Sequence, residues 1–142
     1  MPVTPTPLPS VQATGSVAAL LTAQAQAAGV DPALVKAVAW QESGWRMVIA
    51  ADGGIGIMQL MPATVTWVET TLLGQSIDPY TAADNVRAGV AVLRYYLGVF
   101  GNERLAIAAY PQGLQSVRTQ GVSAGTQQYV ADVLALQQQF AG

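Results

Sequence analysis

The 142-residue chain contains neither cysteine nor histidine. These absences exclude disulfide bonds, catalysis by Ser-His-Asp or Cys-His groups, and the usual zinc sites. Charged residues are also scarce, at 10% of the chain, against roughly 25% in an average globular domain. The six Lys and Arg residues are scattered, so no basic stripe could neutralise phosphates, and nucleic acid is not an expected partner. Acid–base chemistry must come from the eight carboxylates, the five tyrosines, the single lysine or the substrate. We expect neither a metal nor a cofactor.

No apolar stretch approaches the ~20 residues that a membrane-spanning helix requires. A basic segment followed by an apolar run, which is typical of a signal peptide, is also missing. If the protein works outside the cytoplasm, we therefore expect its export signal not to be in this chain. Residues 1–15 are rich in proline and threonine and are interpreted as a flexible lead or linker, which could connect to a membrane anchor or another domain. Residues 16–142 are predicted to form one domain.

Signals for helix boundaries are frequent along this domain. Asp31 followed by Pro32 is typical of a helix start, because the aspartate can cap and the proline suits the first helical position. Thr81 with Asp84 resembles a capping box, and Asn102 is a further candidate cap. These signals predict helix starts at three places.

Apolar residues recur at helical spacing between these signals, and no stretch alternates convincingly as a half-buried strand does. Pro111 is expected to end a helix. The expected helices cover residues 17–28, 31–43, 62–68, 81–100 and 102–111, with a last one from Thr126. The fold class is therefore all-α, with an irregular loop at 46–57 to which any strand is confined.

Glu42 is the most informative residue, because helical geometry places it on the buried face of the helix predicted over 31–43. At about 100° per residue it lies about 20° from Val35 and about 40° from Val38, the valines that define this face. Desolvation disfavours an ionised carboxylate and favours the neutral form that a general acid needs near neutral pH. The alternative is a structural glutamate that is satisfied by hydrogen bonds.

A glycine-rich loop follows Glu42 and contains Gly56 and Gln59. Glycines allow a backbone to approach a ligand closely, and a glutamine side chain offers a donor and an acceptor to sugar hydroxyl or acetamido groups. Alone, such a loop is more often a mere connection. Directly after a buried acid, it is interpreted as one wall of a cleft whose floor holds Glu42.

Several segments together resemble the soluble lytic transglycosylase domain, a family related in fold to goose-type lysozyme. The first two are Glu42-Ser43-Gly44-Trp45 and Gly56-Ile57-Met58-Gln59-Leu60-Met61-Pro62. A central helix over 85–95, the segment Ala106-Ile107-Ala108-Ala109-Tyr110 and a closing helix with Tyr129-Val130 follow in the family's order. The resemblance spans roughly residues 17–140, and several ordered segments are more specific than one motif.

The resemblance implies a lysozyme-like helical domain that cleaves the β-1,4 bond between N-acetylmuramic acid and N-acetylglucosamine in peptidoglycan, outside the cytoplasm. It implies that Glu42 protonates the departing oxygen and then removes the proton of the muramic acid 6-hydroxyl. That oxygen attacks the anomeric carbon and gives a 1,6-anhydro sugar. A tethered attacking group removes the need for a second carboxylate. The implied substrate-binding residues are Gly56, Met58, Gln59, Tyr110 and Tyr129, and the two tyrosines are expected to have a structural role as well, because helix aromatics also pack the core.

Two departures from the family pattern bear on the cleft. The family usually continues with asparagine, alanine and glycine after the tyrosine of its third motif, whereas Pro111-Gln112-Gly113 follows Tyr110 here. The family also tends to have a serine in the loop after its glutamate, and residues 48–52 contain none. Because proline fixes φ and removes a donor, the first departure predicts a reshaped cleft wall.

Two alternative functions remain open at this point. A goose-type lysozyme-like hydrolase would need a second carboxylate to orient water, and Asp52 is the nearest candidate in sequence. Carboxyl groups about 6.5–9.5 Å apart would support an inverting hydrolase. A catalytically silent glycan-binding module is the other alternative, which the presence of Glu42 disfavours.

Overall fold

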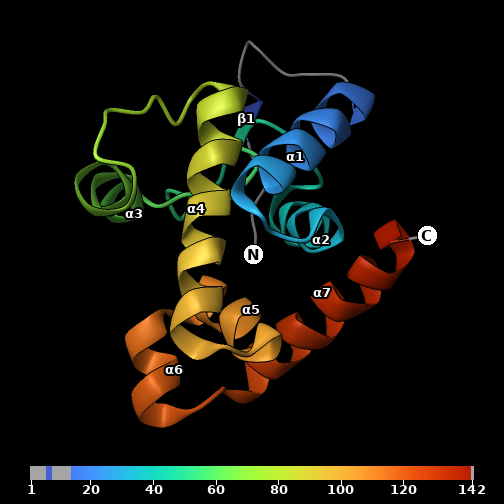
Figure 1. Cartoon of the computed structure of the whole chain (residues 1–142), viewed down its shortest axis with the longest axis vertical. Coiled ribbons are helices and arrows are strands. Elements are labelled where there is room, and N and C mark those ends of the chain that lie inside the picture. Colours follow the sequence, from blue (N-terminus) through green and yellow to red (C-terminus); the bar gives the residue numbers. More distant parts are fainter. Residues whose placement is uncertain (1–5, 8–13, 142) are drawn as a thin grey trace.

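The computed structural model describes residues 6–7 and 14–141 and is built almost entirely of helices (Figure 1). Two-residue strands β1 (Thr6–Pro7) and β2 (Val48–Ile49) form the sheet of the described residues. The helices are α1 (Thr14–Ala28), α2 (Pro32–Ser43), α3 (Pro62–Trp67), the π-helix η1 (Val68–Leu72), α4 (Ala82–Phe100), α5 (Glu103–Gln112), α6 (Leu114–Gln120) and α7 (Ala124–Ala141). The all-α fold class is confirmed.

Two of the predicted caps are present. The Asp31 carboxylate accepts a hydrogen bond from the Ala33 N–H at 3.0 Å, and Asn102 Oδ1 accepts from the Leu105 N–H at 2.9 Å. Helix α2 ends at Gly44, whose φ of 65° is left-handed and lets its N–H bond to the Trp40 carbonyl. Local chemistry therefore sets both ends of the helix that carries Glu42.

The capping box predicted at the start of α4 is not formed. Thr81 makes no side-chain cap, and its hydroxyl donates to the Asp78 carbonyl at 3.1 Å. Asp84 instead accepts from the Asp78 N–H at 2.8 Å. Both side chains are used by the preceding turn, so the turn competes successfully with the cap.

Three other boundaries differ from the prediction. Pro111 lies inside α5, which continues to Gln112, where the side-chain amide bonds the Gly121 carbonyl and the Ser123 N–H. The short helix α6 had no sequence signal that we recognised. Helix α7 begins at Ala124 and not at Thr126, because the Ser123 hydroxyl accepts from the Thr126 N–H and caps the helix.

The N-terminal prediction needs two corrections. Helix α1 begins at Thr14, so the last two residues of the predicted lead are helical and the helix predicted from residue 17 starts earlier. Most of the segment 1–15 lies outside the described residues, but Thr6–Pro7 pairs antiparallel with β2, Thr6 opposite Ile49 and Pro7 opposite Val48. A strand therefore lies outside the region 46–57. A proline is compatible with this place because β1 is an edge strand, where a missing N–H is tolerated.

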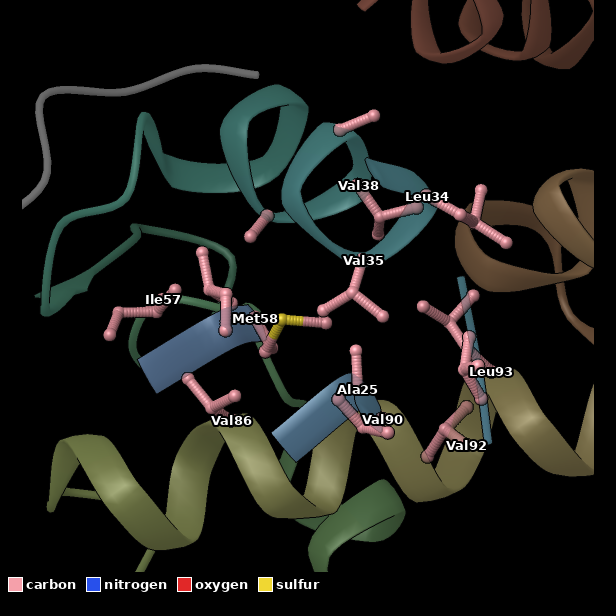
Figure 2. Packing of buried hydrophobic residues seen from close by; sticks show 14 of the residues in the cluster. Ala25, Leu34, Val35, Val38, Ile57, Met58, Val86, Val90, Val92 and Leu93 are labelled. Atoms are coloured by element: carbon pink, nitrogen blue, oxygen red, sulfur yellow. The ribbon is translucent and has the colours of Figure 1, made fainter. Parts of the chain in front are cut away.

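Helix α4 passes through the centre of the domain, with α1 and α2 on one side and α3 on the other (Figure 1). Its Val86, Val90 and Leu93 are buried, as the periodic pattern predicted, and they face Val35 of α2 across the core (Figure 2). None of the described helices is long and apolar enough to span a membrane. Helix α2 packs on α1 and α7 and shares this core with α4, which fixes the position of Glu42.

Candidate active site

Glu42 lies one residue before the end of α2, and its side chain is half-buried. Val35 and Val38 on the same helix are fully buried, as the angular argument required. The Tyr129 hydroxyl of α7 donates a hydrogen bond to Glu42 Oε2 at 2.6 Å. A residue 87 positions away in sequence thus holds the carboxyl group in place.

Burial raises the pKa of Glu42 from 4.5 to about 7. The hydrogen bond from Tyr129 lowers the pKa, because it stabilises the carboxylate, and the negative charge of Asp52 raises it further. Desolvation is the largest of these effects. A large fraction of Glu42 is therefore protonated at neutral pH, which few carboxyl groups achieve.

The segment 44–61 that follows α2 is tied to the helices by buried polar side chains. The Ser43 hydroxyl donates to the Ile57 carbonyl at 2.7 Å. The Asn85 side chain, with no exposed surface, accepts from the Met58 N–H at 2.8 Å and donates to the Ile55 carbonyl at 2.9 Å. The sequence analysis assigned no role to either residue, although an asparagine beside the apolar stripe of α4 was a usable signal.

Gly56 is buried and has a φ of +79°. A Cβ at this position would collide with the side-chain amide of Asn85. The absence of a side chain therefore lets Asn85 reach the loop backbone. This contact gives the glycine a structural role, and its place among the substrate-binding residues stays a prediction.

Met58 was expected to line a sugar subsite, but its side chain lies away from the surface. Its side chain has 0% exposed surface and points into the core between α2 and α4 (Figure 2). It packs on Gly89, where a Cβ would lie 2.5 Å from Met58 Cγ. In this conformation the side chain does not line a sugar subsite. A loop residue has no periodicity from which its direction could have been deduced.

Gln59 is half-buried and has a φ of 52°, which is unusual for a residue other than glycine. Its Nε2 donates to the Gly56 carbonyl at 2.9 Å and to the Val48 carbonyl at 3.3 Å. The side chain thus fixes the same loop from the inside. A backbone conformation of this kind is retained only where the surrounding structure imposes it.

Tyr110 and Tyr129 are both half-buried. The Tyr110 hydroxyl donates to the Met58 carbonyl at 2.6 Å, so it supports the loop from α5. Burial raises the pKa of both tyrosines well above 10, and the charge of Glu42 raises both further. Both hydroxyls therefore stay protonated and act as hydrogen-bond donors near Glu42.

Asp52 is exposed and lies in a turn of the segment 44–61. Its Oδ1 accepts from the Gly54 N–H at 2.9 Å. Its charge raises the pKa of Glu42, which places it in the electrostatic neighbourhood of the acid. The described residues contain no group of three or more carboxylates that could hold a metal ion.

Together these features define a lysozyme-like, all-α domain with one half-buried glutamate at the end of a core helix. Residues 19–132 match the family model described as the transglycosylase SLT domain. The chain therefore belongs to this family.

Similar proteins carry related names. A relative called transglycosylase, from Enterobacteria phage PRD1, is 35% identical over 85 residues, which are 59% of this chain and 30% of that protein. The 70 kDa soluble lytic transglycosylase from Escherichia coli is 28% identical over 87% of this chain, with a TM-score of 0.76. An inactive glutamate-to-glutamine mutant of lytic transglycosylase Slt from Pseudomonas aeruginosa is 26% identical over 84%, with a TM-score of 0.75. The chain spans only 24% and 23% of those two structures.

Proposed function

We propose that this chain is the catalytic domain of a peptidoglycan lytic transglycosylase, which forms 1,6-anhydro ends without consuming water. The observation that carries the proposal is Glu42, with a pKa of about 7 and a tyrosine hydroxyl on one of its oxygens. The family membership supports it. So does the inactive Pseudomonas aeruginosa relative, in which glutamine replaces a glutamate.

In the first step, protonated Glu42 acts as general acid. Tyr129 donates to Oε2, so we assign the transferable proton to Oε1. This proton passes to the glycosidic oxygen while the bond from that oxygen to the anomeric carbon breaks. The N-acetylglucosamine side leaves as an alcohol, and Glu42 becomes a carboxylate that the Tyr129 hydroxyl stabilises.

In the second step, the Glu42 carboxylate acts as base. It takes the proton of the muramic acid 6-hydroxyl while that oxygen bonds to the anomeric carbon. The acid is thereby regenerated, and no water enters the balance. Because the attacking oxygen belongs to the substrate, the reaction gains from proximity. The other site residues support this geometry: Gln59 offers its side-chain oxygen, since its Nε2 is used within the loop, whereas Gly56, Met58 and Tyr110 hold the loop's shape.

The substrate sets where the protein would act. Peptidoglycan glycan strands lie outside the cytoplasm, and we propose an extracytoplasmic site of action. One of the similar solved structures, the 70 kDa soluble lytic transglycosylase, is a complex with bulgecin A. We propose that the surface beside Glu42 binds glycan strands of peptidoglycan.

One observation favours hydrolysis as a second candidate. Asp52 is close enough for its charge to raise the pKa of Glu42, and it is exposed to solvent. An ionised carboxylate in this position could orient a water molecule for attack on the anomeric carbon. The same bond would break, but the product would be a reducing end.

Mass spectrometry of the products from isolated peptidoglycan sacculi separates the candidates. Anhydro ends support the transglycosylase, reducing ends support the hydrolase, and the release of no product identifies a silent binding module. The first result is expected.

Matched variants then assign the acid. Glu42→Gln keeps the side chain's size but removes its proton, so we expect turnover to fall by at least ~10²-fold with glycan binding largely kept. Asp52→Asn should slow the reaction far less, because the one-carboxylate mechanism does not need Asp52. An equal loss in Asp52→Asn, with the fold intact by circular dichroism, would exclude this mechanism.

A further inference from the structure

A groove on the outside of the core lies between α1, the end of η1 and α4, and has a volume of about 600 Å³. None of the residues proposed for catalysis lines it. Its walls are largely apolar and come from residues such as Leu72, Leu73, Val90 and Val99. The groove is therefore a second, independent surface of the domain.

The α4 side of the groove suits the close approach of another backbone. Ala91 and Gly98 line it seven residues apart, so they lie on one face of the helix, and Ala27 lines it from α1. A Cβ added to Gly98 would meet nothing within 4 Å. The stretch of α4 from residue 87 to residue 98 is about 17 Å long, which is about three helical turns. A furrow between two helices with small side chains at its edge fits a third helix.

The groove also carries charge of one sign. Arg87 and Arg94 both line it, and no Asp or Glu does. They are two of only six positive side chains in a chain with a net charge of −2. Their spacing of seven residues places them on the same face, about 10.5 Å apart along the axis. The Arg87 Nη1 donates to the side-chain oxygen of Gln75 at 3.1 Å, which is a neutral partner and does not balance the charge.

We propose that this groove binds an amphipathic helix of a partner protein. The partner's apolar side chains enter the groove, and two acidic side chains seven residues apart pair with Arg87 and Arg94. No helix of a second copy of this chain offers such a pair, because no two of its eight acidic residues are seven positions apart. Charge complementarity therefore points to a different protein.

A synthetic peptide of about 18 residues serves as the probe. It carries leucines at helical spacing and two glutamates seven positions apart on one flank, and a fluorophore for anisotropy measurements with the full 142-residue chain. A second peptide has lysine at both glutamate positions. We expect the glutamate peptide to bind at least about tenfold more tightly at low salt, with the difference shrinking as salt is added. Equal binding of the two peptides overturns the proposal.

Two variants locate the binding. Gly98→Leu fills the groove and should lower the affinity at least about tenfold without lowering Tm, because leucine favours a helix more than glycine does. The double variant Arg87→Glu/Arg94→Glu should reverse the preference, so that the lysine peptide binds better. Arg118→Glu, an exposed arginine of α6 outside the groove, is the matched control and should bind as wild type does.

Other occupants give different results. If dodecanoate binds in the groove and the glutamate peptide does not, the ligand is an anionic amphiphile and the proposal is wrong. If the protein alone forms a dimer in sedimentation experiments and Gly98→Leu abolishes it, the groove belongs to a second copy, which is also contrary to the proposal. If both groove variants bind the peptide as wild type does, the proposal is also wrong.

Discussion

The two long segments without helix, 44–61 and 73–81, are held in different ways. Side chains from three helices bind the backbone of the first: Ser43 of α2, Asn85 of α4 and Tyr110 of α5. The second is held mainly by carboxylates close in sequence, such as the half-buried Asp84 on the Asp78 N–H, and shares only one bond with the buried network, from Asn85 to the Pro79 carbonyl. The first segment therefore takes its shape from the complete fold, and the second largely from its own residues.

The difference matters because only the first segment adjoins Glu42. A loop held from three directions cannot shift without breaking buried hydrogen bonds, and a buried group left without a partner costs about 1–3 kcal/mol. Loops held locally open at much lower cost. The comparison predicts that equivalent substitutions have unequal effects in the two segments.

Glycine substitutions give the largest expected contrast. Gly56→Ala should lower the free energy of unfolding by about 4 kcal/mol, since a left-handed alanine costs about 1–2 kcal/mol and crowding against Asn85 adds about 1–3 kcal/mol. Gly74→Ala is the control, because Gly74 also has a positive φ but open space around it. Gly74→Ala should lower the free energy of unfolding by only about 1–2 kcal/mol. Urea denaturation measures both, and equal losses would mean that crowding at Gly56 is unimportant.

Asn85 offers the next contrast. Asn85→Ala leaves the Met58 N–H and the Pro79 carbonyl without a partner and removes one of the two hydrogen bonds to the Ile55 carbonyl. It should lower the free energy of unfolding by about 3 kcal/mol. Its half-buried neighbour in sequence provides the control: Asp84→Asn keeps an oxygen that can accept from the Asp78 N–H and should change the same quantity by about 0.5 kcal/mol or less. If the two variants melt alike, the buried network does not hold the first segment.

The charge state of Glu42 should affect stability. The folded protein keeps the Glu42 proton up to about pH 7, whereas an ordinary glutamate, with a pKa of 4.5, releases it earlier. The folded state thus binds more protons between these values, so the free energy of unfolding falls as pH rises through this range. Glu42→Gln lacks this loss and should be more stable than wild type at pH 8, by about 2–3 kcal/mol, with little difference at pH 4. Melting temperatures across this range measure the effect, and a constant difference would contradict it.

The smallest expected effect is that of Tyr129→Phe, and it concerns the pH dependence of activity. The hydrogen bond from Tyr129 lowers the pKa of Glu42, so Tyr129→Phe should raise that pKa. The fall of kcat/KM above about pH 7 would then begin at a higher pH, because Glu42 must be protonated to act. Tyr110→Phe is the matched control, since its hydroxyl binds the Met58 carbonyl and not Glu42. It should lose about 1 kcal/mol of stability without moving the profile in the same way.

The sequence carried enough information for features that depend on neighbouring residues. The cap at Asp31, the buried stripe of α4 and the position of Glu42 on the inner face of α2 all follow from spacing along one helix. The end of α5 could not be predicted from Pro111 in this way. The helix continues to Gln112, whose side chain bonds to residues 121 and 123, about ten positions away.

The loop beside the acid was the least predictable part. Its motif indicated Met58 and Gly56 as contacts for sugar, but the first is in the core and the second makes room for Asn85. Nothing in a loop's own sequence states which of its sides faces the protein. That information is held by Asn85 and Tyr110, 27 and 52 residues from Met58.

The packing of α7 on α2, which brings Tyr129 to Glu42, also sets the time at which the acid becomes buried. Ribosomes make the chain from its N-terminus, so α2 is complete long before α7 emerges and packs along it. Until then Glu42 is more open to water, and its pKa lies nearer to that of an ordinary glutamate, because burial is the largest cause of its raised pKa. A chain interrupted during synthesis would therefore carry the complete glutamate motif and still be a poor acid at neutral pH. On the proposed mechanism, catalytic competence therefore arrives only with the last helix.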